Sequence, residues 1–325
     1  MKTPRYLIFY LIFASLSCSV RLDLEGDIIA GAEGAVAWMT PLPDDRPVAS
    51  LSIPGAHDAA TAGVTAWKTW TQTQDLDIAA LWNCGVRAFD LRPALVGGTM
   101  GIYHDKYSCN VTFPEVMKAL ILALEKHPGE GAIVLIRHEE EADGNNPEWG
   151  AEMGRCLAGL REHLVDYRDG LTLGQLRGKI LVLSRNEYAG GPHGAYIKGW
   201  TSGTDVSAQK RALLMVRDGP TCPFWVQDYY HPNGAEDKWA QVKGLLDAVG
   251  AGPAPLTVNH ASGYVGTLPD YRSNARDINA RAAEYIRASG KPAGIVMMDF
   301  AGVDRSGGKE VAGKTLIKAL LGPVR

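Results

Sequence analysis

The feature that most constrains the fold is a series of eight short apolar runs, each bounded by turn-forming residues. The runs are VASLSI (48–53), VRAFDL (86–91), GIYH (101–104), AIVLIR (132–137), KILVLS (179–184), FWVQ (224–227), LTVN (256–259) and GIVMMDF (294–300). Segments with helical periodicity separate most of them, over residues 114–126, 147–164, 236–249 and 274–288. Eight strands that alternate with helices predict an α/β fold, a (βα)8 TIM-type barrel, as a single domain over residues 30–325.

One connection breaks this alternation. The segment 92–100 is too short for a helical crossover between parallel strands, so we expect an irregular barrel. Gly97-Gly98 predicts a hairpin turn at this point. Counting outward from the turn places Arg92 opposite Tyr103, with His104 one residue further along.

The first 19 residues resemble a secretory signal. Lys2 and Arg5 precede an apolar stretch that is too short to span a bilayer, so we expect export to a secreted or extracytoplasmic location. Cys18 leaves a second interpretation open, in which 1–19 is a lipoprotein signal and the mature chain is lipid-anchored through that cysteine.

Several function classes are disfavoured by composition and by missing motifs. A formal net charge of -3 without a Lys/Arg run argues against a nucleic-acid partner. No GxSxG elbow and no GxxxxGK[ST] loop is present, which argues against serine esterases and P-loop enzymes. The spacing of Cys84, Cys109, Cys156 and Cys222 fits no zinc site and leaves one or two disulfides open.

Ionisable residues follow almost every apolar run. The successive runs lead into His57-Asp58, Asp90 with Arg92, His104-Asp105, Arg137-His138, Arg185, Asp228 with Tyr230, Asn259-His260 and Asp299. The strand ends of such a barrel meet on one rim, where the chemistry of this fold takes place. We therefore expect these side chains to converge on one site.

Two histidines and an arginine on one rim suit the cleavage of a phosphodiester by a neighbouring hydroxyl. One imidazole takes the proton of the nucleophile and the other donates a proton to the leaving oxygen. Arg92 is the predicted phosphate ligand, because a guanidinium offers a bidentate fork and keeps its charge. Asp58 or Asp299 would orient the imidazoles.

Two other patterns have competing interpretations. Glu139, Glu140 and Glu141 follow His138 without the second histidine of a zinc-protease helix, so we interpret them as a solvated loop. Trp67 and Trp70 follow the first histidine closely and could enter a membrane interface. Packing of both rings into the outer layer of the barrel is the alternative.

Taken in order, LSIPGAHDAAT, GVRAFDLRP, GIYHD, GKILVLSRN, WVQDYY and GIVMMDF resemble the bacterial phosphatidylinositol-specific phospholipase C family, with matches from about residue 48 to 300. The resemblance implies an irregular barrel that cleaves phosphatidylinositol in two steps, through an inositol 1,2-cyclic phosphate. It also implies that no metal or other cofactor is needed. The expected partner is an inositol lipid at a membrane surface, and no protein partner is predicted.

The resemblance also implies roles for individual residues. His57 looks like the general base on the inositol 2-hydroxyl and His104 like the general acid, while Arg92 would hold the phosphate. The family pattern further implies that Asp299 is the partner of the base, Asp58 the carboxylate behind the acid and the arginine, Asp90 a supporting neighbour, Arg185 and Asp228 ligands of inositol hydroxyls, and Tyr230 a ring stacked on the inositol. Where the family often has a lysine after the fourth strand, this chain has Arg137-His138, and His138 is the predicted substrate contact.

Two alternatives remain from other classes of function. A metal-dependent glycerophosphodiester phosphodiesterase has a similar barrel, but it needs a cluster of carboxylate ligands that the strand ends do not supply. A catalytically inactive inositol-lipid-binding protein is the other, and it would have been indicated by loss of one of the two histidines.

Overall fold

The computed structural model describes residues 35–322, so the predicted signal segment 1–19 and Cys18 lie outside the described residues. Within them, strands of one sheet close into a barrel because β6 also pairs with β8. The barrel strands are β1 (Ser52–Ala56), β2 (Ala88–Leu91), β6 (Ala132–Ile136), β8 (Ile180–Ser184), β9 (Ala195–Lys198), β10 (Ala212–Val216), β11 (Cys222–Gln227), β12 (Thr257–His260) and β13 (Gly294–Met298).

The order of the strands around the barrel is β6-β2-β1-β13-β12-β11-β10-β9-β8. Neighbouring strands are parallel except at β10, which is antiparallel to both β9 and β11. The short strand β7 (Leu164–Val165) pairs with β8 outside this ring. The predicted α/β barrel and its irregularity are therefore confirmed, but the ring has nine strands in the described part of the chain.

The predicted third barrel strand is wrong. The run 101–104 lies in β4 (Thr99–His104), which forms a separate antiparallel sheet with β3 (Pro93–Val96) and β5 (Tyr107–Thr112). The hairpin itself is as predicted, because Val96 pairs with Thr99 and the Tyr103 amide donates to the Arg92 carbonyl at 3.0 Å. The missing place in the barrel is filled by β9 and β10, which are antiparallel and are joined through one short helix, α7 (Val206–Gln209), without a long helical crossover.

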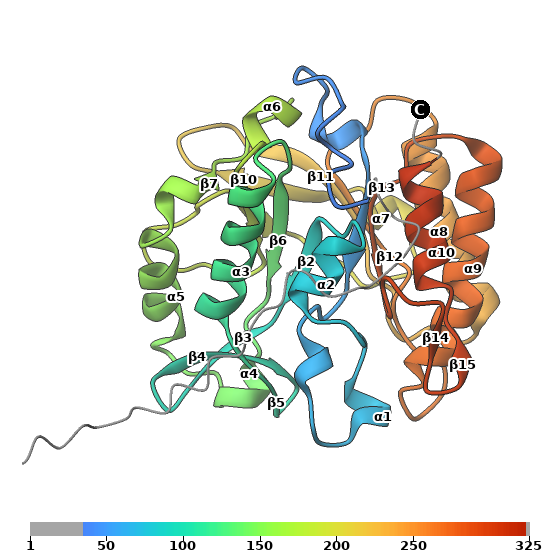
Figure 1. Cartoon of the computed structure of the whole chain (residues 1–325), viewed down its shortest axis with the longest axis horizontal. Coiled ribbons are helices and arrows are strands. Elements are labelled where there is room, and N and C mark those ends of the chain that lie inside the picture. The colour runs from blue at the N-terminus through green and yellow to red at the C-terminus, as the bar shows by residue number, and fades with distance from the viewer. Residues whose placement is uncertain (1–34, 323–325) are drawn as a thin grey trace, which may run out of the picture.

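Helices surround the barrel (Figure 1). The described helices are α1 (Lys68–Thr71), α2 (Ile78–Asn83), α3 (Phe113–Lys126), α4 (Glu140–Asp143), α5 (Trp149–Ala158), α6 (Leu173–Leu176), α7 (Val206–Gln209), α8 (Ala235–Gly250), α9 (Tyr271–Ser289) and α10 (Gly313–Leu321). The structure contains three of the predicted helical segments nearly in full, as α3, α8 and α9. The predicted helix over 147–164 ends early, and 3-10 turns lie at Val48–Ser50, Thr61–Gly63 and Arg161–His163.

Side chains of the barrel strands alternate between two hydrophobic clusters. Ile53, Ala88, Leu135, Leu183, Val226, Val258 and Met297 belong to the cluster inside the barrel. Residues beside them, such as Phe89, Val134 and Val182, pack outward with the helices. The period of two therefore decides which residues beyond each strand face the barrel axis.

Strand β1 continues through Pro54 and Gly55, although these two residue types are typical of turns and interrupt the apolar run in the sequence. The Pro54 carbonyl accepts a hydrogen bond from the Arg87 amide at 2.9 Å. Gly55 faces the interior, where a Cβ atom would lie 2.5 Å from Sδ of Met297. The glycine thus leaves space for the side chain of a core methionine. Because the strand continues to Ala56, His57 lies at the rim of the barrel.

Among residues 35–322, no helix is both long enough and apolar enough to cross a membrane. The four cysteines in this part of the chain are free thiols, so none of the disulfides left open by the sequence is formed between them.

Candidate active site

The candidate site lies where the parallel strands end, beside α1, α4 and the β3–β5 sheet. Figure 1 shows these elements, together with the hairpin of β14 (Arg305–Ser306) and β15 (Lys309–Glu310), along one end of the molecule. Side chains alternate between the inside and the outside of the barrel along each strand. When this alternation is continued past the strand ends, the inward-facing positions are those of His57, Arg92, Arg185, Asp228 and Asp299. These five of the predicted residues thus lie at inward-facing positions at the same end of the barrel.

His57 lies between a carboxylate and a guanidinium. Its Nδ1 is 2.8 Å from Oδ1 of Asp299, and its Nε2 is 2.8 Å from Nη2 of Arg92. A guanidinium nitrogen can only donate, so Nε2 must accept, and the ring proton must be on Nδ1, where it is donated to Asp299. This neutral tautomer has its free lone pair at Nε2, which is the form that a general base requires.

The charges around His57 favour the uptake of a proton. Burial alone lowers the pKa of this imidazole, but Asp58 and Asp299 outweigh burial and the opposing charge of Arg92, and they raise the pKa to about 9. A proton that His57 accepts from a hydroxyl is therefore held firmly, and the neutral form, in which Nε2 can act as a base, becomes the main form only as the pH rises to about 9.

Asp58 joins the two histidines and the arginine. Its Oδ2 is 3.5 Å from Nε2 of His57 and 3.6 Å from Nε2 of His104, while its Oδ1 forms an ion pair with Nε of Arg92. Although burial opposes ionisation, Arg92 and the two imidazoles hold the pKa of Asp58 below its usual range. The residue has a left-handed backbone, with φ of 44°, which turns its carboxylate back over the rim.

His104 comes from β4, outside the barrel, and reaches the same carboxylate. Its Nδ1 is 2.6 Å from the carbonyl oxygen of Thr71, and its Nε2 faces Asp58. The Thr71 carbonyl can only accept a hydrogen bond, so the His104 ring donates through Nδ1. The two imidazoles therefore share the Asp58 carboxylate but differ in their close partners, which are Asp299 and Arg92 for His57 and the Thr71 carbonyl for His104.

Arg92 is largely buried and is surrounded by carboxylates. Besides its contact with Asp58, its Nη2 is 3.8 Å from Asp90 and its Nη1 is 3.8 Å from Glu139. The interpretation of Glu139 as part of a solvated loop is wrong, because its side chain is only 1% exposed. Burial raises the pKa of Glu139 to about 7, against the effect of the Arg92 charge.

Three of these residues could also coordinate a metal ion. His57, Asp58 and Asp90 offer ligand atoms that all lie within 4.8 Å of one another. The Arg92 guanidinium contacts each of the three residues, so a fixed cation already serves them. A second cation there would be repelled by the guanidinium.

His138 is not part of this cluster. Its Nε2 is 2.8 Å from Oδ2 of Asp143, and its ring stacks on Trp149 with centroids 4.5 Å apart. The structure therefore corrects the predicted substrate contact. Arg137 has the inward parity of Leu135, and its charge acts on both Asp58 and Glu139. The residue of the pair that faces the site is the arginine.

A second group of side chains lies on the opposite part of the rim. The Arg185 guanidinium is 4.5 Å from the centre of the Trp200 ring, whose Nε1 donates to Asp228 at 2.8 Å. Tyr230 is 51% exposed, and its ring centroid is 6.5 Å from that of Tyr264. The group combines a cation, an anion and an accessible aromatic face, which suits a polyhydroxylated ring.

His260 also belongs to the site; the sequence analysis named it among the residues that follow the strands but gave it no role. Its ring meets that of His57 edge-on with centroids 5.6 Å apart, and its Nδ1 is 3.0 Å from Oγ of Ser262. Burial lowers the pKa of His260 to about 4 despite the nearby charge of Asp228. Strand parity could have found it, since His260 is two residues after the inward-facing Val258.

Known proteins resemble the chain in sequence. A 1-phosphatidylinositol phosphodiesterase from Listeria monocytogenes is 29% identical over 193 residues, which is 56% of this chain and 58% of that protein. A 1-phosphatidylinositol phosphodiesterase from Staphylococcus aureus is 24% identical over 293 residues, or 82% of this chain and 88% of that protein. No protein-family model matches the chain.

The fold has solved counterparts as well. A variant of the phosphatidylinositol-specific phospholipase C from Staphylococcus aureus has a TM-score of 0.71 at 21% identity, covering 88% of this chain and 96% of that one. The phosphatidylinositol-specific phospholipase C from Listeria monocytogenes has a TM-score of 0.69 at 22% identity, covering 88% and 97%. These comparisons confirm the resemblance that the motifs indicated: the chain is a sequence and structural relative of the bacterial phosphatidylinositol-specific phospholipases C.

Proposed function

We propose that the chain is a phosphatidylinositol-specific phospholipase C that releases diacylglycerol and inositol 1,2-cyclic phosphate. One observation supports this function above all others. The Asp58 carboxylate holds two imidazoles and a guanidinium around one point, and the close partners of the two imidazoles differ.

In the first step each imidazole transfers one proton. His57 Nε2 takes the proton of the inositol 2-hydroxyl, whose oxygen attacks phosphorus. The bond from phosphorus to the diacylglycerol oxygen breaks, and His104 Nε2 protonates that oxygen. In the second step the histidines exchange tasks, and water opens the cyclic phosphate to inositol 1-phosphate.

Arg92 supplies the positive charge for the phosphoryl oxygens. In the free chain its Nη2 occupies the position beside Nε2 of His57 that the hydroxyl needs. A bound phosphate would draw the guanidinium toward itself and free that nitrogen. Preorganised charge of this kind is often the largest catalytic contribution.

The substrate headgroup would bind across the second part of the rim. Arg185 and Asp228 offer a donor and an acceptor for ring hydroxyls, and Tyr230 offers an exposed aromatic face. Arg137 takes the place that the sequence analysis gave to His138. Together these residues favour an inositol lipid as the substrate.

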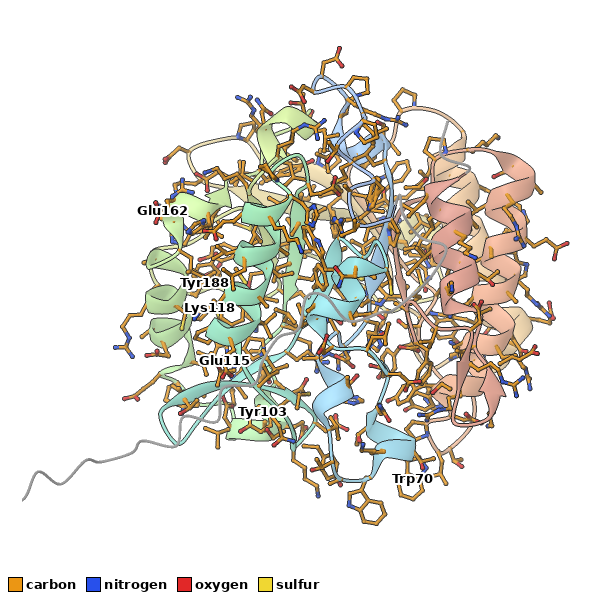
Figure 2. All side chains as sticks on the ribbon, viewed as in Figure 1. Trp70, Tyr103, Glu115, Lys118, Glu162 and Tyr188 are labelled. Carbon is orange, nitrogen blue, oxygen red and sulfur yellow. The ribbon has the colours of Figure 1, made fainter. Side chains whose placement is uncertain are left out.

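Tryptophans at the same end suit a membrane surface. Trp67 is 60% exposed and stacks on Trp70 with centroids 5.1 Å apart, so packing of Trp67 into the outer layer of the barrel is ruled out. Figure 2 shows Trp70, which belongs to α1, at the end of the molecule that carries the site. Export through residues 1–19 would bring the chain to such a surface and stays a prediction.

The experiment that tests this function removes each imidazole in turn. His57→Ala and His104→Ala should each lower the rate of diacylglycerol release by about two to four orders of magnitude, the usual effect of a positioned acid or base. His163→Ala is the matched control, because His163 lies on the 3-10 turn after α5. Near-normal turnover in either rim variant would remove that residue from the mechanism.

The two alternatives have less support. The His57, Asp58 and Asp90 group that a metal-dependent phosphodiesterase could use is already served by Arg92. A binding protein without turnover would have no need of two imidazoles with different hydrogen-bonding environments.

A further inference from the structure

Gln74 lies in the loop between α1 and α2 and is completely buried. Its Nε2 donates two hydrogen bonds, to the carbonyl oxygen of His57 at 2.8 Å and to that of Met298 at 2.9 Å. Its Oε1 accepts a third from the Ala301 amide at 2.9 Å. One carboxamide thus joins two chain segments at the rim.

One of these segments carries His57, the predicted general base, and the other carries Asp299, its predicted partner. His57 and Asp299 are 242 positions apart in the chain and come from the neighbouring strands β1 and β13. The last backbone contact between the strands runs from the His57 amide to the Met298 carbonyl at 3.1 Å. Beyond that contact, the Gln74 side-chain amide links the two segments through the carbonyl groups of His57 and Met298, next to the points where the side chains of His57 and Asp299 begin.

The same loop supports His57 from a second side. Thr73 Oγ1 donates to the His57 carbonyl at 3.2 Å and is 2.8 Å from Oγ1 of Thr61. Thr61 Oγ1 also accepts from the Gln74 amide at 3.0 Å, which fixes the backbone of the glutamine. The glutamine therefore lies in a hydrogen-bonded frame and not in an adaptable pocket.

We propose that Gln74 is a positioning residue that sets the distance and angle between the His57 imidazole and the Asp299 carboxylate. Its catalytic consequence rests on the proposed function, in which His57 is the base. An apolar side chain at this position removes three hydrogen bonds and leaves the buried Ala301 amide without its partner, while the His57 carbonyl keeps Thr73 Oγ1 and the Met298 carbonyl keeps the His57 amide. Gln74 is fully buried, so it acts through His57 and not through the substrate.

The test is Gln74→Met, which keeps the side-chain length and removes the hydrogen bonds. We expect kcat on a water-soluble inositol phosphodiester to fall by about 10- to 100-fold, the cost of a small misplacement of a catalytic group. The KM should stay within about twofold, because the headgroup ligands are unchanged. In ¹H–¹⁵N spectra of the imidazoles, the His57 titration should move down by about one pKa unit as the contact with Asp299 loosens.

Gln209→Met is the matched control, because Gln209 is equally buried and its Nε2 donates to Gly203 and Gln241 on the outside of the barrel. The control should leave kcat and the His57 titration unchanged. If Gln74→Met does not fold, Gln74→Asn, which is one methylene shorter, should show the same changes at smaller size.

An unchanged His57 titration in a folded Gln74 variant would overturn the proposal, and so would a rise in KM at constant kcat. The titration separates this proposal from the proposed function. If wild-type protein turned over no inositol phosphodiester while the titration still moved in Gln74→Met, the positioning role would stand and the assigned reaction would fall.

Discussion

Replacement of Arg92 by lysine tests how the site stabilises charge on the phosphate. The guanidinium contacts Asp58 through Nε, His57 through Nη2 at 2.8 Å, and Glu139 through Nη1 at 3.8 Å. One ammonium group can replace only one of these nitrogens, so at least one charge-assisted hydrogen bond to a phosphoryl oxygen is lost in the transition state. A lost donor of this kind costs about 3 kcal/mol, which corresponds to a fall in kcat of about 10²- to 10³-fold.

The assay measures kcat and KM on phosphatidylinositol vesicles and on a water-soluble inositol phosphodiester, with thermal unfolding as a check on the fold. Arg177→Lys is the control, because Arg177 directly follows α6 and binds Asp44 and the Leu42 carbonyl before β8 begins, at the end of the barrel opposite to the site (Figure 1). It should lower stability and leave kcat unchanged. A folded Arg92→Lys protein with kcat within tenfold of wild type would refute the reasoning.

Other predictions concern metal, membrane and pH. Excess EDTA should leave activity intact, because the Arg92 cation replaces a metal; activity that vanished with EDTA and returned with calcium would contradict this. Replacing Trp67 and Trp70 by alanine should lower activity on vesicles and spare a water-soluble substrate, whereas equal loss on both would favour a packing role. Burial lowers the pKa of His57, but Asp58 and Asp299 outweigh it and raise the pKa from 6.5 to about 9. Protonation of His57 therefore contributes fully to the stability of the fold below pH 6.5, and this contribution is lost as the pH rises to about 9. The free energy of unfolding, measured in urea, should fall between pH 6 and pH 9.5 by about 3 kcal/mol more in wild type than in His57→Asn. An equal fall in the two proteins would argue against the raised pKa.

The barrel could be predicted because its parallel strands are buried on both faces and therefore read as apolar runs. Strand β10 was missed although Ala212–Val216 is apolar, because only the four-residue helix α7 precedes it and no helix separates it from its antiparallel neighbour β11. The run 101–104 was misplaced for the opposite reason. Its composition is that of a strand, but only long-range pairing decides which sheet a strand joins.

Residues of the candidate site that directly follow a strand could be predicted from the sequence, and residues from loops could not. His57, Arg92 and Asp299 lie one residue beyond regular strands, so strand ends located them. The choice between Arg137 and His138 required the parity of the strand, which the sequence analysis did not apply. Gln74 could not be found in this way, because it comes from a loop and acts through backbone atoms that carry no sequence signal.

The most direct test of the central claim is phosphorus NMR of the purified protein acting on phosphatidylinositol vesicles in excess EDTA. Attack by the 2-hydroxyl, with His57 as base and His104 as acid, predicts that the resonance of inositol 1,2-cyclic phosphate appears first and is followed slowly by that of inositol 1-phosphate. The appearance of phosphatidic acid, or of a linear phosphate monoester without a preceding cyclic phosphate, would contradict the proposed mechanism.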